Sequence, residues 1–94
     1  MCTEFDVQLG RRLRRRRRLL GLSQQTLGEG CGVRYQQIQK YETADNRVSA
    51  VMIGRLAHAL GVSVDYFYEG LDALIEAPNS GLRSLTARPQ ALQP

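Results

Sequence analysis

Apolar residues recur along this chain at the three- and four-residue spacing of helices that bury one face. Leu9, Leu13 and Leu20 predict a first helix over residues 6–20, which ends where Gly21 can adopt a left-handed conformation. A fourth helix has the most regular pattern, with apolar residues at positions i, i+3, i+4 and i+7: Ile53, Leu56, Ala57 and Leu60. The hydrophobic pattern therefore predicts an all-α chain.

The other helices are indicated by the residues at their ends. Serines at three expected helix starts can accept hydrogen bonds from first-turn amides: Ser23, Ser49 and Ser63. The first of these predicts a second helix over about residues 23–31. Gly32 then turns the chain into a third helix over about residues 34–42, on which Ile38 and Tyr41 share one apolar face. The last serine begins a fifth helix.

The fifth helix would carry an apolar stripe if it continued through Gly70. The stripe consists of Tyr66, Phe67, Tyr68, Leu71, Leu74 and Ile75. Because a core this small gains stability from a partner, we expect the stripe to form both core and homodimer surface. The segment Pro78-Asn79-Ser80-Gly81 breaks any helix, so one domain is expected over residues 1–77, followed by a flexible tail over 78–94.

The charge of the chain is concentrated in one run of arginines. The net charge is +4, and seven of the arginines lie between Arg11 and Arg18. Five consecutive arginines surround a helix completely, so at least one must point inward. Arg17 lies nearest the leucine stripe, and a buried guanidinium needs a carboxylate partner, for which we predict Glu42. The excess of positive charge indicates a polyanionic partner.

The third helix offers the chemistry that reads DNA. Its outward residues would be Arg34, Tyr35, Gln36, Gln37, Gln39 and Lys40, with no acid before Glu42. Amides, guanidinium, ammonium and phenol groups are those that hydrogen-bond base edges and phosphates. We therefore expect this helix to lie in the major groove of double-stranded DNA.

Other classes of function find little support in the residues. Cys2 and Cys31 are far apart and His58 has no second ligand at metal spacing, so neither a metal nor a cofactor is expected. No catalytic constellation or phosphate-cradling glycine loop is present, which argues against an enzyme. No apolar run approaches a membrane span and no secretion signal begins the chain, so a cytoplasmic location is expected.

An ordered set of short segments carries a family resemblance. They are Leu9-Gly10-Arg11-Arg12-Leu13-Arg14, Gly21-Leu22-Ser23-Gln24, Leu27, Gly32-Val33, Ile38-Gln39-Lys40-Tyr41-Glu42, Asn46-Arg47-Val48-Ser49 and Leu56 through Phe67. Together they resemble the phage-repressor (Xre, Cro/CI-type) helix-turn-helix transcriptional regulators. The resemblance implies a five-helix lambda-repressor-like domain that acts as a homodimer, a repressor on a pseudo-palindromic operator, in the nucleoid of a bacterium or a phage host.

The resemblance also implies roles for individual residues. Base contacts fall on Arg34, Tyr35, Gln36 and Lys40. Phosphate contacts fall on Gln24, Gln37, Asn46 and Arg47, to which the arginine run adds Arg11 and Arg14. Arg17 and Glu42 match the pair that ties the first helix to the third. The chain departs from the family pattern at Arg34, which replaces a small N-cap residue, and at Gly28, which replaces alanine and indicates a close helix approach.

Two alternative functions remain open from the sequence. The same module serves antitoxins of toxin–antitoxin pairs, in which case the tail over residues 78–94 would fold onto a toxin as protein partner. The arginine run could instead bind RNA or nucleoid DNA without sequence preference. Competition between a defined duplex and bulk nucleic acid separates this last hypothesis from specific operator binding.

Overall fold

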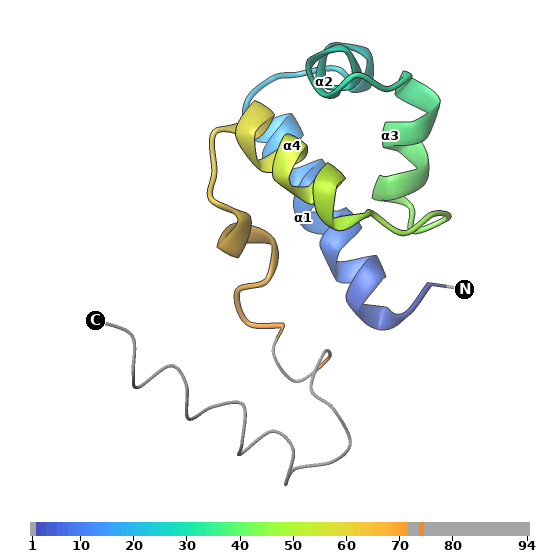
Figure 1. Ribbon diagram of the computed structural model, residues 1–94, viewed down its shortest axis with the longest axis vertical. Coiled ribbons are helices and arrows are strands. Elements are labelled where there is room, and N and C mark those ends of the chain that lie inside the picture. The colour runs from blue at the N-terminus through green and yellow to red at the C-terminus, as the bar shows by residue number, and fades with distance from the viewer. Residues whose placement is uncertain (1, 72–73, 75–94) are drawn as a thin grey trace, which may run out of the picture.

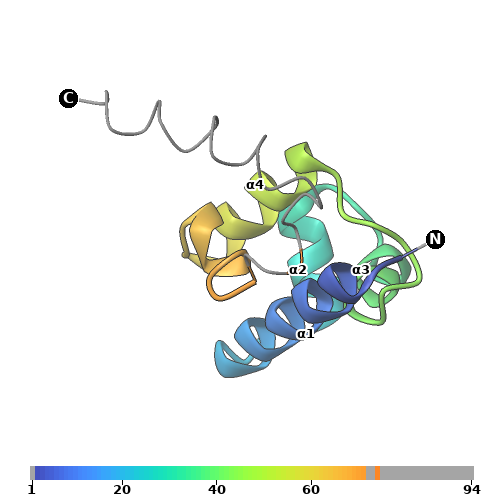
Figure 2. The same ribbon diagram turned by 90° about the horizontal axis from the view of Figure 1, so that it is seen from below.

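The computed structural model describes residues 2–71 and residue 74 of the chain. Four α-helices follow one another: α1 (Glu4–Leu19), α2 (Gln24–Cys31), α3 (Tyr35–Glu42) and α4 (Ala50–Leu60). A short 3-10 helix, η1 (Val64–Phe67), comes last (Figure 1). The two views place η1 and α3 on opposite sides of the pair α1 and α4 (Figures 1 and 2). The described residues contain no strand, in agreement with the all-α prediction.

Two of the three predicted serine caps form, and Thr3 adds a cap that was not predicted. The Ser23 and Ser49 hydroxyls accept hydrogen bonds from the amides of Thr26 and Met52. Helix α1 begins two residues earlier than expected, because Thr3 forms a capping box. The amide of Thr3 donates to Oδ2 of Asp6 at 2.6 Å, and the hydroxyl of Thr3 accepts from the amide of Asp6 at 3.4 Å.

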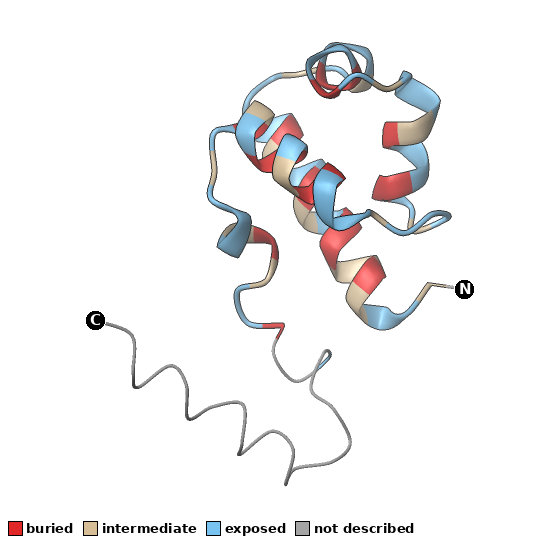
Figure 3. Ribbon diagram, in the orientation of Figure 1, coloured by how far each residue is buried: buried red, intermediate tan, exposed pale blue. Residues whose placement is uncertain are grey.

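The core lies where all five elements meet (Figure 3). Its six largest enclosed side chains come from every element: Leu13, Leu27, Ile38, Leu56, Leu60 and Phe67. Ile38 is fully buried and Tyr41 is 8% exposed, so the apolar face of α3 is held firmly against the rest of the domain. The opposite face of α3 is left to the solvent.

Two sequence predictions about the apolar pattern are wrong. Leu20 is 42% exposed, because it is the C-cap of α1 and lies beyond the last helical turn. The predicted fifth α-helix is only the 3-10 turn η1, since its N-cap Ser63 makes no side-chain hydrogen bond and Gly70 turns the chain away at φ +76°. The stripe is therefore divided, with Phe67 and Leu71 buried and Leu74 exposed. Ile75 and the tail over residues 78–94 lie outside the described residues.

Two arginines of the run fasten α1 to the later elements through carbonyl groups. Nε of Arg16 donates to the carbonyl oxygen of Leu60 at 3.0 Å, at the end of α4. Nη1 of Arg12 donates to the carbonyl oxygen of Tyr66 at 3.0 Å, within η1. A cation suits these positions because helix C-termini carry unpaired carbonyls and partial negative charge. The arginine run is thus partly structural.

Candidate nucleic-acid interface

Helix α3 presents a continuous polar face to the solvent. The four residues predicted to contact bases are all exposed: Arg34, Tyr35, Gln36 and Lys40. Tyr35 is 47% exposed, although it is an aromatic residue on a helix whose other aromatic, Tyr41, is buried. Gln37, predicted to contact phosphate, is half-buried. The outer side of α3 thus offers hydrogen-bond donors and acceptors, while its inner side is buried in the domain.

The turn before α3 is compact, which fixes the angle between α2 and α3. The carbonyl oxygen of Gly28 accepts from the amide of Val33 at 2.9 Å, and Gly32 ends α2 in the left-handed region at φ +77°. A Cβ atom added at Gly28 would lie 2.6 Å from the carbonyl oxygen of Val33. A close backbone approach at Gly28 is therefore present, but it is made by the turn before α3 and not, as predicted, by another helix.

The start of α3 differs from the other helix starts. Arg34 is the N-cap residue and makes no side-chain hydrogen bond to the helix. Its guanidinium is therefore not engaged in capping, and the residue is exposed beside the first turn of α3. The replacement of a small N-cap residue by Arg34 therefore leaves α3 without a side-chain cap. The helix still begins and ends close to the predicted residues.

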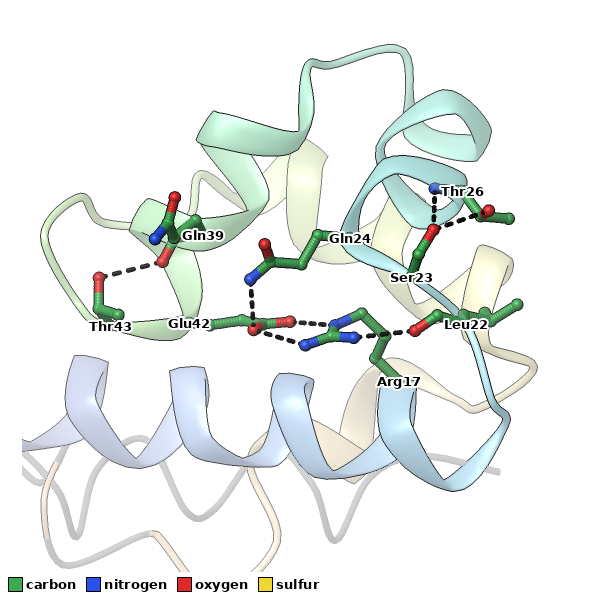
Figure 4. A network of polar contacts seen from close by, with 8 residues as sticks. All are labelled: Arg17, Leu22, Ser23, Gln24, Thr26, Gln39, Glu42 and Thr43. Atoms are coloured by element: carbon green, nitrogen blue, oxygen red, sulfur yellow. Dashed lines mark hydrogen bonds and ion pairs between the residues drawn. The ribbon is translucent and has the colours of Figure 1, made fainter.

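A buried polar network joins α1, α2 and α3 (Figure 4). Nε and Nη2 of Arg17 donate to the two carboxylate oxygens of Glu42 at 2.6 and 3.1 Å. Nη1 of Arg17 donates to the carbonyl oxygen of Leu22 at 2.8 Å, and Nε2 of Gln24 donates to Glu42 at 3.1 Å. The predicted ion pair is thus present, with side chains only 10% and 2% exposed. The network fixes the position of α3 and of Gln24, the first residue of α2, relative to α1.

Four of the six residues predicted to contact phosphate lie around this network or in the loop after α3. Arg14 and Gln24 line an open hollow of about 440 Å³ together with Arg18, Gln39 and Thr43. The last three were not predicted as contacts. For Arg18 the signal was available, since it lies four residues after Arg14 on the same helix. Arg11 is exposed on α1 as well, three residues before Arg14.

The loop between α3 and α4 carries the other two predicted phosphate contacts, Asn46 and Arg47, both exposed. Nε of Arg47 lies 3.3 Å from Oδ2 of Asp6, so the loop is tied to the start of α1. Burial by itself raises the pKa of the Asp6 carboxyl, but the hydrogen bonds from Thr3 and the charge of Arg47 outweigh it and hold that pKa below its ordinary value.

Replacement of Asp6 by asparagine is expected to alter the pH dependence of stability. A carboxyl whose pKa is lower in the folded state stabilises the fold above its unfolded pKa of about 3.9, and this stability disappears as the pH falls through the folded pKa. The wild-type chain should therefore be more stable than Asp6→Asn at neutral pH, and the difference should shrink below about pH 4. Urea unfolding at a series of pH values measures this difference; a gap that stayed constant with pH would contradict the expectation.

Features of other kinds of site are sparse in the described part of the chain. No group of three His, Cys, Asp or Glu residues there could hold a metal ion. Cys31 is buried, and burial raises the pKa of its thiol. None of the described helices is long and apolar enough to cross a membrane.

Comparison with known proteins places these features in a family context. The model of the family HTH_3, described as helix-turn-helix, matches residues 13–67, which is more than half of the chain. An HTH-type transcriptional regulator of Sinorhizobium medicae is 43% identical over 77 residues, which cover 82% of this chain and 51% of that protein. A transcriptional regulator from the ATPase CF(0) region of Rhodospirillum rubrum is 48% identical over 67 residues, covering 71% and 62%. The chain spans about half the length of the first of these relatives.

Solved structures show the same fold. The restriction-modification controller protein C.AhdI from Aeromonas hydrophila superposes with a TM-score of 0.63 and 36% identity, over 65% of this chain and 92% of that protein. The P22 c2 repressor, solved in complex with a synthetic operator, superposes with a TM-score of 0.62 and 32% identity, over 66% and 94%.

Proposed function

We propose a DNA-binding function from the premise that this chain belongs to the helix-turn-helix (HTH_3) family of HTH-type transcriptional regulators. The chain binds a pseudo-palindromic operator as a homodimer, represses transcription there, and places one α3 helix in each of two successive major grooves. The DNA-binding unit comprises residues 1–77. The P22 c2 repressor, a structural neighbour solved on operator DNA, supports this proposal.

One observation carries the proposal: α3 buries its apolar face and exposes a row of groups suited to base edges. Ile38 is 0% exposed, whereas Gln36 and Lys40 are exposed on the same helix. Gln36 is assigned to direct readout, because an amide can pair bidentately with adenine. Arg34, Tyr35 and Lys40 complete the base-contacting set.

The phosphate contacts surround this reading face. They are Arg11, Arg14, Gln24, Gln37, Asn46 and Arg47. The assignment of Gln24 is supported by its hydrogen bond to Glu42, which orients the amide through one N–H. The other N–H and the oxygen of the amide take no part in that contact. Such contacts position a protein on the duplex without reading its sequence.

The homodimer surface is narrower than the sequence predicted. Phe67 and Leu71 are buried within this chain, so among the described residues of the stripe Tyr66, Tyr68 and Leu74 remain available to a partner. Tyr68 also stacks on Phe5, with ring centroids 5.5 Å apart. Because η1 lies opposite α3 in both views, a partner bound there would leave the reading face open (Figures 1 and 2).

Replacement of Gln36 by alanine tests the readout. With an operator selected from random duplexes, Gln36→Ala should reduce the ratio of specific to non-specific affinity by roughly 10- to 100-fold, because one bidentate base contact contributes about 1–3 kcal/mol. The slope of log affinity against log salt should stay the same, since no phosphate contact is lost.

Gln37→Ala is the matched control, one amide removed at the next position of the same helix. It should weaken operator and random duplex by similar factors. Fluorescence anisotropy with both duplexes at several salt concentrations measures each quantity. If the specificity ratio of Gln36→Ala equalled that of the unmodified chain, the assigned readout would be refuted.

A further inference from the structure

The seven arginines of α1 divide into two groups. Arg12, Arg16 and Arg17 are engaged within the domain, the first two by carbonyl oxygens and the third by Glu42. The other four are Arg11, Arg14, Arg15 and Arg18, and all are exposed. Within the described residues none of these four lies within ion-pair distance of an acid. Among the described residues, their charge is therefore not paired with an acid.

The four exposed arginines lie on one side of α1. They occupy positions i, i+3, i+4 and i+7, so they form a single stripe about 10 Å long at 1.5 Å per residue. Like charges at this spacing destabilise a helix. We refer to Arg11, Arg14, Arg15 and Arg18 as the basic stripe. The basic stripe destabilises α1, so a function other than folding would account for its presence.

The basic stripe is continuous with the reading side of the domain. Arg14 and Arg18 line the hollow that also contains Gln24, Gln39 and Thr43, beside the C-terminal end of α3. The same two arginines line a second open hollow, of about 500 Å³, with Arg11, Arg15 and Leu19. The exposed arginines thus extend from the hollow beside α3 along the outer face of α1.

We propose that the basic stripe binds the phosphate strand that flanks the major groove entered by α3, so that Arg15 and Arg18 extend the phosphate contacts beyond the operator half-site. This inference rests on the proposed DNA-binding function and adds to it a second contact region, which requires duplex beyond the bases that are read. The hollow that Arg14 and Arg18 share with Gln24 and Gln39 favours DNA over an acidic protein segment as the partner of the stripe. The feature that would suit a protein partner instead is Leu19 at the end of the stripe, which is 72% exposed.

The test replaces Arg15 and Arg18 by glutamine, which removes only the two charges that the proposal adds to the phosphate contacts and keeps good helix formers. Each phosphate contact contributes about 0.9 to the salt slope, so the slope should become shallower by roughly 2. Arg55→Gln removes one exposed arginine of α4 as a control and should leave the slope unchanged. Thermal unfolding of each variant confirms that the fold is retained.

Duplex length provides the second measurement. Trimming the operator to the outer edges of its half-sites should weaken binding of the unmodified chain and should not affect the variant with glutamine at positions 15 and 18. An unchanged salt slope, or equal sensitivity of both proteins to trimming, overturns the proposal. If binding of polyglutamate falls in the same variant while the slope is unchanged, the stripe belongs to an acidic protein partner instead. The specificity ratio of Gln36→Ala does not depend on the salt slope or on duplex length. Failure of the proposed DNA-binding function can therefore be distinguished from failure of the proposal about the basic stripe.

Discussion

Replacement of Glu42 by alanine is expected to lower the free energy of unfolding by about 3–5 kcal/mol, because it leaves a buried guanidinium without its counter-charge. The side chains of Arg17 and Glu42 are 10% and 2% exposed, and two hydrogen bonds join them. A domain of this size has only about 5–15 kcal/mol of stability, so the variant should unfold well below the temperature of the unmodified chain.

Urea unfolding at neutral pH measures this loss. The matched control is the double variant Arg17→Met with Glu42→Leu, which replaces the pair by apolar side chains of similar volume. It should recover most of the stability, because the cost of the single variant comes from the unpaired charge. A loss below about 1 kcal/mol for Glu42→Ala would show that Arg17 reaches solvent when its partner is removed, as exposed ion pairs contribute no more than this.

Replacement of Gly10 by alanine is expected to destabilise the domain by about 1–3 kcal/mol, the usual effect of inserting an atom into a filled interior. A Cβ atom at this position would lie 2.5 Å from the carbonyl oxygen of Tyr41 and 2.7 Å from that of Glu42. Both are backbone atoms, so the last turn of α3 would have to move away from α1. Helix propensity alone predicts the opposite sign, since alanine is favoured over glycine by about 1 kcal/mol.

Gly54→Ala is the matched control in the interior of α4. Apart from its chain neighbours and the nearby backbone of α4, no atom lies within 4 Å of a Cβ added there, so propensity acts alone and a gain of about 0.5–1 kcal/mol is expected. Differential scanning calorimetry of the two variants should therefore show melting temperatures that move in opposite directions. Stabilisation by both substitutions would mean that α1 and α3 are less closely packed than the structure shows.

Several functional features could be read from neighbouring residues along the chain. The outward chemistry of α3 was predicted because Ile38 and Tyr41 specify which face is buried, and the exposed face then follows from helix geometry. The pair Arg17–Glu42 was predicted because five consecutive arginines cannot all avoid the interior. The close approach at Gly28 was predicted from a glycine where helix propensity disfavours one.

Other features depend on backbone positions that are distant in the chain. The sequence separated Arg17 from the run but could not separate Arg12 and Arg16 from the exposed arginines, because the carbonyl groups that hold these two belong to η1 and α4. The same holds for Gly10, whose neighbours are carbonyl oxygens of α3. A backbone carbonyl has no residue identity, so no pattern of residue types indicates that it will be a partner.

By itself, then, the sequence determined where α2, α3 and α4 begin, which faces α3 and α4 bury and what chemistry α3 offers, since these properties arise within one or two turns. Only the tertiary structure decided that the expected fifth helix is a single 3-10 turn and that Phe67 and Leu71 turn inward. It also decided that four arginines are left on one exposed stripe. Those outcomes depend on how the helices pack against one another, and packing satisfies carbonyl groups and fills space in ways that local spacing does not specify.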